Sequence, residues 1–495
     1  MSRTAVIVGA GPVGCLAALA LAKRGWIVHI YEARPDIRLP VSKAATQQRS
    51  INLAISHRGI AAIEAIDTGA AQTFLRDAIP MRGRMIHTLD GRLDSQLYDA
   101  HRQCINSIDR ALLNEELLEA VSNLPNIKIY FLHKVLSTDF VKKYLTIRDL
   151  STNQEVSTKF DLCVGADGSY SIIRRQMMRA VKMDYQQEYI DHEYVELKMP
   201  SGRDDSDRPT FLLDPNHLHI WPRHSFMLIA LPNKDMTFTC TLFAPSSELD
   251  RLADSGKVLA WFTSHFPDAV KLIGEKKLLD DFTRNPRSPL ICTKSKPYHY
   301  KDCAILLGDA AHSMVPFYGQ GLNCGLEDVR VLMTLFREEG LEPMSPALVD
   351  GVDVNLARAL QRYSETRHAD LIAICDMAMN NYVEMRHSVT TVSYLLKKYV
   401  DTALYALTCG KPAFIESLVP VLARMPYPSA SASGWIPLYT MVTFRPDIGY
   451  ATAKQKASQQ DKLLVVSGWI GMILCWVLAA FLAQIMWDRF GTWDR

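Results

Sequence analysis

The first residues of the chain follow the hydrophobic pattern of a strand, a helix and a second strand. TAVIV (4–8) is a continuous apolar run, CLAALALAKRG (15–25) is apolar at helical spacing, and WIVHIYE (26–32) is a second apolar run. This order predicts a βαβ unit, in which two parallel strands are joined by a helix. The chain therefore opens with the pattern of an α/β fold.

Four later stretches extend this picture. AILLG (304–308) reads as a buried strand, and a helix with apolar positions at helical spacing is predicted to begin at about Gly321. FMLIALP (226–232) and MTFTCTLFA (236–244) alternate polar and apolar residues, which is typical of half-buried strands. We therefore expect a mixed α/β (α+β) fold in which a second, mostly antiparallel sheet accompanies the parallel one.

The segment from Leu463 to Met486 contains 24 residues and no charge. A helix of that length is about 36 Å long, enough to cross a hydrocarbon core of roughly 30 Å. Lys454, Lys456 and Lys462 precede it, so the positive-inside tendency puts the globular part in the cytosol. We predict a membrane-spanning tail; a buried core helix is the alternative.

Composition excludes some classes of protein. The 495 residues carry a formal net charge of +2, which leaves no broad basic field for nucleic acid. The 10 cysteines include no CxxC and no Cys/His cluster, so we expect reduced thiols and no metal site. His312 is expected to be a structural histidine.

The loop after the first strand is GAGPVG, in which Gly9, Gly11 and Gly14 match G-x-G-x-x-G. These glycines permit a tight turn, close approach to a pyrophosphate and close contact between helix and strand. Glu32 ends the second strand, 18 residues after Gly14, where an acid accepts a hydrogen bond from the adenosine ribose. The loop fits FAD and NAD equally well, because both contain adenosine diphosphate.

A second bend, around Asp309 and Gly321, favours FAD. Asp309 follows the strand 304–308 and suits a ribityl hydroxyl, while the backbone near Leu322 and Asn323 suits the redox-active ring. Nicotinamide cofactors have no ribityl chain, although an ordinary strand–turn–helix would give the same pattern. A third element, DLCVGADGSYSIIRR (161–175), combines a loop and an acid with two arginines, which suits a transient anionic visitor.

In their order and positions, the GxGxxG, DG and GD motifs resemble those of the single-component FAD-dependent aromatic hydroxylases. Four further stretches resemble the branch of that family that acts on kynurenine; they are SINLAISHRG (50–59), IPMRGRMIH (79–87), NYVEMR (381–386) and IPLYTMVTF (436–444). The chain departs from this pattern at 397–433, where the connection between Asn381 and Tyr439 is longer than usual.

The resemblance implies a set of binding residues. With the motif residues Gly9, Gly11, Gly14, Asp167 and Gly321, the implied FAD contacts are Val13, Glu32, Arg34, Ala54, Arg110, Val135, Asp309, Leu322 and Asn323. The amino-acid end of the substrate is implied to lie against Arg84, Tyr98, Asn381 and Tyr439.

Residue chemistry agrees with part of this set. An arginine presents a planar fork of donors to a carboxylate, and tyrosine hydroxyls can complete the site, although Arg84 alone would read as a surface base. Asn381 follows Ile374 and Ala378 on the apolar face of a helix, so its buried amide needs either a structural partner or a ligand. No residue is assigned as a general base.

The implied reaction is the hydroxylation of L-kynurenine to 3-hydroxykynurenine. No second GxGxxG is present, so NADPH visits transiently, reduced FAD reacts with O2 to a C4a-hydroperoxide, and the distal oxygen passes to the aniline ring. The resemblance also implies a place in the mitochondrial outer membrane. Two alternatives stay open, a membrane-anchored escort protein with a flavin-type fold but no redox activity, and a related flavin epoxidase.

The order of the motifs predicts interleaved domains. The FAD-binding domain is expected at 1–75, 100–185 and 285–370, and the substrate sheet at 76–99 and 186–284. A helical region at 371–450, a linker at 451–462 and the anchor at 463–486 complete the prediction.

Overall fold

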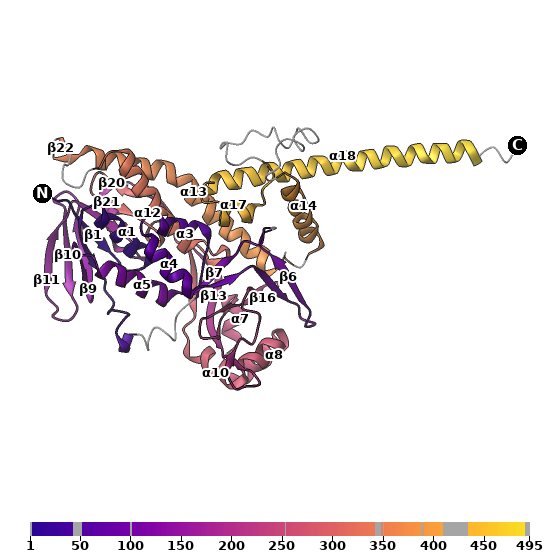
Figure 1. Cartoon of the computed structure of the whole chain (residues 1–495), viewed down its shortest axis with the longest axis horizontal. Coiled ribbons are helices and arrows are strands. Elements are labelled where there is room, and N and C mark those ends of the chain that lie inside the picture. Colours follow the sequence, from indigo (N-terminus) through magenta and orange to yellow (C-terminus); the bar gives the residue numbers. More distant parts are fainter. Residues whose placement is uncertain are drawn as a thin grey trace.

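The chain folds around two large β-sheets, and one long helix leaves the body (Figure 1). The computed structural model describes residues 2–42, 52–99, 101–252, 254–341, 348–349, 351–387, 389, 391–408 and 434–490. Ser50 and Ile51 of the stretch 50–59, and the part of the long connection at 409–433, lie outside the described residues.

The first sheet contains the predicted βαβ unit. Its six strands lie in the order β20-β21-β12-β1-β2-β8 and are parallel except for β20. The strands are β1 (Thr4–Val8), β2 (Ile27–Tyr31), β8 (Ile127–Tyr130), β12 (Leu162–Gly165), β20 (His299–Tyr300) and β21 (Ala304–Leu306). The strand order continues in both directions from β1, to β12 on one side and to β2 on the other. A crevice therefore forms at the carboxyl end of β1, which is the usual ligand position in open α/β sheets.

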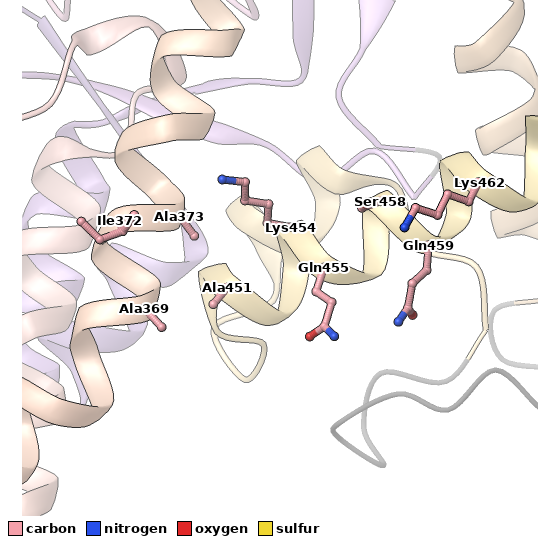
Figure 2. A pocket seen from close by; sticks show the side chains of 9 residues that line it. All are labelled: Ala369, Ile372, Ala373, Ala451, Lys454, Gln455, Ser458, Gln459 and Lys462. Atoms are coloured by element: carbon pink, nitrogen blue, oxygen red, sulfur yellow. The ribbon is translucent and has the colours of Figure 1, made fainter.

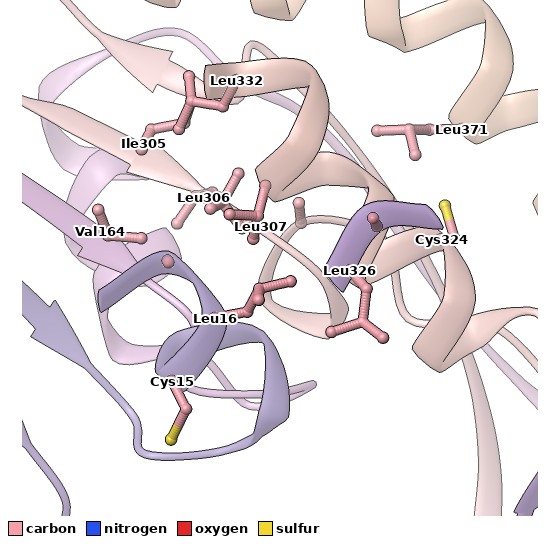
Figure 3. Close-up of a cluster of buried hydrophobic side chains, with 14 of the residues drawn as sticks. Cys15, Leu16, Val164, Ile305, Leu306, Leu307, Cys324, Leu326, Leu332 and Leu371 are labelled. Atoms are coloured by element: carbon pink, nitrogen blue, oxygen red, sulfur yellow. The ribbon is translucent and has the colours of Figure 1, made fainter. Parts of the chain in front are cut away.

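Two helices with glycine-bearing starts pack together on this sheet. They are α1 (Pro12–Lys23) and α12 (Gly321–Glu338), and α12 begins where the sequence predicts. Figure 3 shows the buried side chains that fill the space between the helices and the sheet, among them Leu16, Val164, Ile305, Leu306, Leu326 and Leu332. This apolar core fixes the two helix starts relative to each other.

The second sheet has seven strands in the order β19-β13-β18-β17-β16-β5-β6, antiparallel except for the parallel pair β16 and β5. The strands are β5 (Gly83–His87), β6 (Leu93–Leu97), β13 (Asp184–Met199), β16 (His217–Arg223), β17 (Phe226–Pro232), β18 (Phe238–Ala244) and β19 (Ser288–Lys296). A separate core joins it to the helices α7 (Ser246–Arg251), α8 (Ser255–His265), α9 (Pro267–Ile273) and α10 (Glu275–Arg284). The mixed α/β fold is therefore confirmed.

Smaller elements connect the two sheets. Two three-stranded sheets are formed by β3 (Asn52–Ile55), β7 (Ile105–Asp109) and β4 (Ile79–Met81), and by β9 (His133–Asp139), β10 (Tyr144–Asp149) and β11 (Glu155–Lys159). The pairs are β14 (Gly202–Arg203) with β15 (Pro209–Thr210) and β22 (Leu348–Val349) with β23 (Val352–Asp353). The remaining helices here are α3 (His57–Glu64), α4 (Thr68–Asp77), α5 (Arg110–Ser122), α6 (Ile172–Ala180), α11 (Asp309–His312) and the 3-10 turn η1 (Pro316–Tyr318).

The described residues of the C-terminal part form the helices α13 (Val354–Arg386), α14 (Val392–Thr408), α17 (Leu438–Phe444) and α18 (Tyr450–Phe490). Residues 451–462, predicted as a linker, form the first turns of α18 and pack against α13 (Figure 2). Ala453, Lys456 and Gln460 are buried at helical spacing, which explains why this polar stretch is ordered. From Val465 to Met486 the described side chains of α18 are mostly apolar and exposed, and the helix is long enough to cross a membrane.

Candidate active site

A single cavity of about 920 Å³ joins the crevice at β1 to the second sheet. Its walls come from segments spread between residues 8 and 439. The predicted site residues that line it are Gly9, Gly11, Val13, Glu32, Arg34, Ala54, Arg84, Tyr98, Arg110, Val135, Asp167, Asp309, Gly321, Leu322 and Tyr439. Gly14, Asn323 and Asn381 are not part of the lining. Folding thus brings fifteen of the eighteen predicted residues to one cavity.

The glycines of the first bend differ in what surrounds them. Gly9 has φ +101°, and a Cβ there would lie 2.5 Å from the carbonyl oxygen of Ala166. A Cβ at Gly14 would lie 2.1 Å from the oxygen of Gly9, so Gly14 serves the contact between helix and strand. At Gly11 a Cβ would meet nothing within 4 Å, because this residue faces the cavity. Since no side chain caps α1, its N-terminus offers partial positive charge to a pyrophosphate.

Glu32 lies at the end of β2 as a buried carboxylate. It accepts hydrogen bonds from the backbone N–H of Ala10 at 2.9 Å and from Nε of Arg34 at 2.9 Å. Burial acts to raise the pKa of Glu32, but the hydrogen bonds and charge of Arg34, with the Ala10 bond, hold that pKa below its usual range. An ionised carboxylate keeps further lone pairs, so Glu32 can still accept from a ribose hydroxyl.

The second bend packs directly on the first. Gly308 has φ +59°, and Cβ atoms built on Gly308 and Gly325 would lie 3.1 Å and 2.7 Å from Cγ2 of Val13. Only glycine allows this close approach, so the strand–turn–helix around Asp309 is fixed against the GxGxxG loop. The N-terminus of α12 has no side-chain cap either, and its first residues, Gly321 and Leu322, line the cavity. Two helix N-termini therefore open on one cavity.

The third sequence element, residues 161–175, contributes the acid Asp167 to the cavity. Oδ2 of Asp167 accepts from the backbone N–H of Ile172 at 2.7 Å, whereas the buried Oδ1 has no hydrogen-bond partner among the described residues. Burial raises the pKa of Asp167. Of the two arginines predicted to meet a visitor, only Arg175 lines the cavity; Arg174 is buried and donates to the Ala310 oxygen at 2.7 Å. Arg174 is thus part of the scaffold.

Arg84 forms the centre of an aromatic cluster at the other end of the cavity. Its guanidinium lies 5.8 Å from the ring centroid of Tyr98 and 5.3 Å from that of Tyr439, and the two rings stack at 5.0 Å. The Nε of Arg84 and the hydroxyl of Tyr98 are buried without a hydrogen-bond partner in the described part of the chain. Burial raises the pKa of Tyr98, so its hydroxyl stays protonated. The cluster therefore offers unused donors to an acceptor such as a carboxylate.

Asn323 and Asn381 do not line the cavity, but their side chains form hydrogen bonds with residues that do. Asn323 accepts from the backbone N–H of Ser56 at 2.9 Å and donates to the oxygens of Ala54 at 2.9 Å and Gly319 at 2.7 Å. Asn381 donates to the Phe317 oxygen at 2.7 Å, so the partner of its buried amide is the turn η1. Both side chains position lining residues.

Sequence reasoning missed three polar residues around Arg84. Glu384 accepts from Nη1 of Arg84 at 3.4 Å, and Tyr394 and Lys398 of α14 lie near this pair. Burial and the positive charge of Arg84 lower the pKa of Lys398 to about 8. The motif NYVEMR contained a signal for Glu384, because it lies three residues after Asn381 on the same helix.

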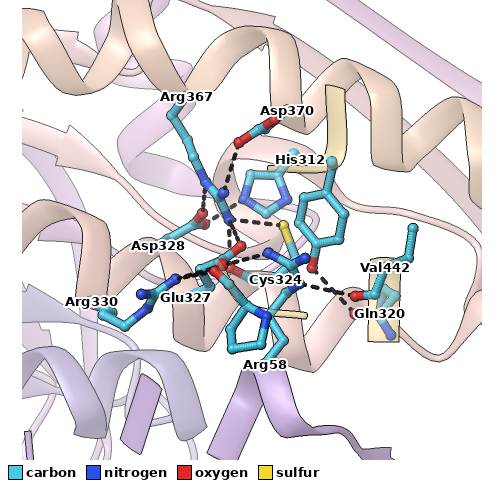
Figure 4. A network of polar contacts seen from close by, with 12 residues as sticks. Arg58, His312, Gln320, Cys324, Glu327, Asp328, Arg330, Arg367, Asp370 and Val442 are labelled. Carbon is cyan, nitrogen blue, oxygen red and sulfur yellow. Dashed lines mark hydrogen bonds and ion pairs between the residues drawn. The ribbon is translucent and has the colours of Figure 1, made fainter. Parts of the chain in front are cut away.

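Figure 4 shows a buried ionic network beneath the second bend. Arg367 donates to Asp328 at 3.0 Å and to Glu327 at 2.8 Å, and Nε2 of His312 lies 2.5 Å from Asp328. Ligand atoms of His312, Cys324 and Asp328 lie within 4.8 Å of one another, a grouping that the sequence did not indicate. Arg367 also contacts the Cys324 sulfur at 3.5 Å, and burial raises the pKa of that thiol. A guanidinium beside a neutral thiol suits an ionic network better than a metal ion.

Comparison with known proteins is consistent with this geometry. The family described as "FAD binding domain" matches residues 2–350. Kynurenine 3-monooxygenase of Cryptococcus neoformans var. neoformans serotype D (strain B-3501A) is 44% identical over 99% of both chains, and that of Yarrowia lipolytica is 43% identical over 95% of this chain and 93% of its own.

Among solved structures, Pseudomonas aeruginosa PqsL in complex with 2-aminobenzoylacetate aligns with a TM-score of 0.61 at 16% identity, covering 78% of this chain and 97% of its own. The tetrameric form of 2-methyl-3-hydroxypyridine-5-carboxylic acid oxygenase aligns with a TM-score of 0.59 at 19% identity, covering 80% and 95%. At such identities the likeness establishes the fold alone.

The fold and the cavity, together with these matches, define an FAD-dependent aromatic monooxygenase. The fit of the cofactor is supported by the open face at Gly11, the free oxygen of Asp167 and the two uncapped helix N-termini. Within this class, the chain belongs to the kynurenine 3-monooxygenase family.

Proposed function

We propose that the chain converts L-kynurenine, NADPH, H⁺ and O2 into 3-hydroxykynurenine, NADP⁺ and water. The observation that carries the proposal is the single cavity, which connects the bends suited to FAD with the donors around Arg84. Relatives named kynurenine 3-monooxygenase match this chain over nearly their full length. FAD supplies the redox chemistry when bound, by taking a hydride and activating O2.

The chain's own residues would hold that cofactor at four places. Gly11 and the N-terminus of α1 would take the pyrophosphate, Glu32 the adenosine ribose, and Asp309 the ribityl chain. The N-terminus of α12 would take the ring end, where its partial positive charge would favour the reduced, anionic cofactor. Arg34, Ala54, Arg110 and Val135 complete the walls of this part of the cavity.

The cluster around Arg84 orients the substrate. Arg84 pairs with the substrate carboxylate, and the hydroxyls of Tyr98 and Tyr439 donate to it. Glu384, next to Arg84, suits the ammonium group of the same amino acid. The aniline ring then lies among the apolar side chains of the second sheet and of η1, which include Leu218, Ile229, Phe243 and Phe317. These side chains exclude water from the reacting ring, and its amino group activates the neighbouring carbon.

Substrate dependence of NADPH oxidation tests this function. Full-length protein with bound FAD is expected to oxidise NADPH faster with kynurenine, and to form one hydroxylated product for each NADPH consumed. The decarboxylated amine of kynurenine is the matched control, because it keeps the ring and loses only the group that Arg84 would bind. Equal rates with both compounds, or no hydroxylated product, would contradict the proposal. Among the described residues, no observation favours the escort or epoxidase alternatives.

We further propose that α18 anchors the protein in a membrane, with the globular part in the cytosol and the mitochondrial outer membrane as the compartment. The support is an exposed apolar helix of sufficient length that follows Lys454, Lys456 and Lys462. Retention in the membrane pellet after alkaline carbonate extraction is expected. Release into the supernatant would contradict anchoring, and enrichment with another organelle would contradict the compartment.

A further inference from the structure

The helix α14 has two opposite faces with different chemistry. Its inner face presents Tyr394, Lys398, Asp401 and Tyr405 at helical spacing. Asp401 accepts from Nε1 of Trp435 at 2.9 Å, and the ring of Tyr405 lies 5.2 Å from that of His101. Tyr394 and Lys398 approach Arg84. The inner face is therefore packed against the body, next to the substrate cluster.

The outer face of α14 is apolar and exposed. The exposed fractions are 60% for Leu396, 76% for Tyr399, 40% for Val400 and 55% for Leu407. With Ala403, which is exposed as well, these residues recur at helical spacing and form one stripe on the side opposite Tyr394 and Tyr405. A stripe of four large apolar side chains on one helix differs from the single exposed apolar residues that soluble surfaces normally carry.

The position of α14 relative to α18 indicates what covers this stripe. Nζ of Lys397 pairs with Oδ1 of Asp461 at 2.6 Å, so α14 touches α18 at the last charged pair of residues, Asp461 and Lys462, before its apolar run begins. In Figure 1 α14 lies beside the foot of α18, on the side of the body from which α18 leaves, and runs across the direction of α18. A membrane crossed by α18 would therefore have its surface at the level of the stripe.

We propose that the outer face of α14 lies in the interfacial region of the bilayer that α18 enters and forms a second contact with the membrane. This inference rests on the proposed anchor. Amphipathic helices in such a position bury their apolar face at the boundary between head groups and acyl chains. Because the inner face of the same helix approaches Arg84, the lipid contact holds α14 over the substrate cluster.

Fluorescence quenching in phosphatidylcholine nanodiscs tests the proposal with the full-length chain. In a Cys104→Ser, Cys409→Ser, Cys475→Ala background, a polarity-sensitive label is placed by Tyr399→Cys on α14, Val466→Cys on the anchor, or Thr152→Cys at the β10–β11 turn. Quenching by spin-labelled lipid is expected to be several-fold stronger at positions 399 and 466 than at 152, while aqueous iodide quenches chiefly the label at 152.

The outcomes separate this inference from the anchor on which it rests. A label at 466 that lipid does not quench refutes the anchor itself. If 466 is quenched and 399 is open to iodide, the anchor stands and the contact by α14 is wrong. A label at 399 that is shielded from both quenchers means that protein covers the stripe, which also overturns the proposal.

A matched pair of variants gives a second measurement. Leu396→Glu with Val400→Glu adds two carboxylates to the stripe, and it is expected to reduce lipid quenching at position 399 several-fold. Ser393→Glu with Thr402→Glu adds the same charge at exposed polar positions of α14 and is expected to leave the quenching unchanged. Equal effects of the two pairs would show that charge alone matters, and would refute a specific apolar contact.

Discussion

At the scale of single residues, Gly11 and Gly14 belong to one motif but are needed for different physical reasons. Gly14 packs on the Gly9 oxygen, whereas Gly11 has open space around the position of a Cβ. We expect Gly14→Ala to lower the free energy of unfolding of the apoprotein by about 1–3 kcal/mol through overpacking. Gly11→Ala should change it by less than about 0.5 kcal/mol and instead raise the Kd for FAD.

Two measurements check this contrast, urea unfolding of the apoprotein and titration with FAD. An equal loss of apoprotein stability in both variants would mean that Gly11 is structural as well. Unchanged FAD affinity in Gly11→Ala would contradict a pyrophosphate at this glycine.

Arg84→Lys keeps the positive charge and removes the planar fork of donors. A bidentate pair with a carboxylate is worth about 1–3 kcal/mol more than a point contact, so KM for kynurenine should rise roughly 5- to 150-fold. The decarboxylated amine should show no such rise, and the content of bound flavin should not change. Steady-state kinetics with both compounds check this, and a similar rise for both would make Arg84 a structural residue.

Lys398 introduces a pH dependence near the substrate cluster. Arg84, Asp94 and Glu384 face it, and its pKa is lowered to about 8. As pH rises through this value Lys398 loses its charge, the positive potential beside Arg84 falls, and KM for the anionic carboxylate should rise between roughly pH 7 and 9. Lys398→Gln should abolish this part of the profile and leave the titration of the substrate itself; a superimposable profile would contradict the role.

The sequence predicts these residues unequally. The glycines and Arg84 lie in short motifs whose geometry is local, so a single segment reveals them. Tyr394 and Lys398 lie in an amphipathic helix, where the pattern shows that one face is buried but not which element it meets. Their proximity to Arg84 arises from tertiary packing across about 300 residues of chain.

At the scale of elements, Arg58 connects α3 to α12, to α17 and to the segment between α17 and α18. It is fully buried, pairs with Glu327 at 2.7 Å, and donates to the oxygens of Val442 at 3.0 Å and Ile448 at 2.7 Å. Removing one partner of a buried ion pair leaves the other uncompensated. Arg58→Ala should therefore destabilise the protein by about 3–5 kcal/mol in urea unfolding followed by flavin fluorescence.

Arg76→Ala is the control for that measurement, because Arg76 is a surface arginine bonded only to Thr73 at 3.3 Å among the described contacts. It should change stability by less than about 0.5 kcal/mol. Equal effects of the two substitutions would refute a special role for the buried network.

Element boundaries are predictable where apolar residues recur at a clear strand or helix spacing, and less predictable where this spacing is indistinct. The bounds of β1 and the starts of β21 and α12 agree with the sequence patterns, whereas β21 ends at Leu306, two residues before the predicted end. The stretch 451–462 looked like a linker because it is polar, yet Ala453, Lys456 and Gln460 repeat on one helical face. Small residues and the aliphatic parts of long polar ones pack well on α13, and hydrophobicity alone does not reveal this.

At the scale of the whole molecule, the fold joins segments that are far apart in sequence. The cavity takes walls from β1, from the second sheet and from α17. The motif order predicted that the two sheets interleave, and the structure shows both sheets built from separated segments, while the domain limits themselves stay a prediction. Which residues from each segment meet in the cavity depends on long-range packing that local patterns do not encode.

Because both bends line one cavity, FAD and its ADP half are expected to protect different segments of the backbone. In the proposed binding mode FAD would reach from the GxGxxG loop to the N-terminus of α12, whereas ADP carries only the adenosine and pyrophosphate that the first bend would bind. At about 100 times its Kd, each ligand stabilises the apoprotein by about 2.7 kcal/mol, so global stability does not distinguish them. Local hydrogen exchange does, because protection follows contact. Both ligands should slow amide exchange at Gly9–Val13, and FAD alone should slow it at Gly321–Asn323. Equal protection of Gly321–Asn323 by ADP would place no cofactor ring at α12, and the two bends would then not hold opposite ends of one ligand.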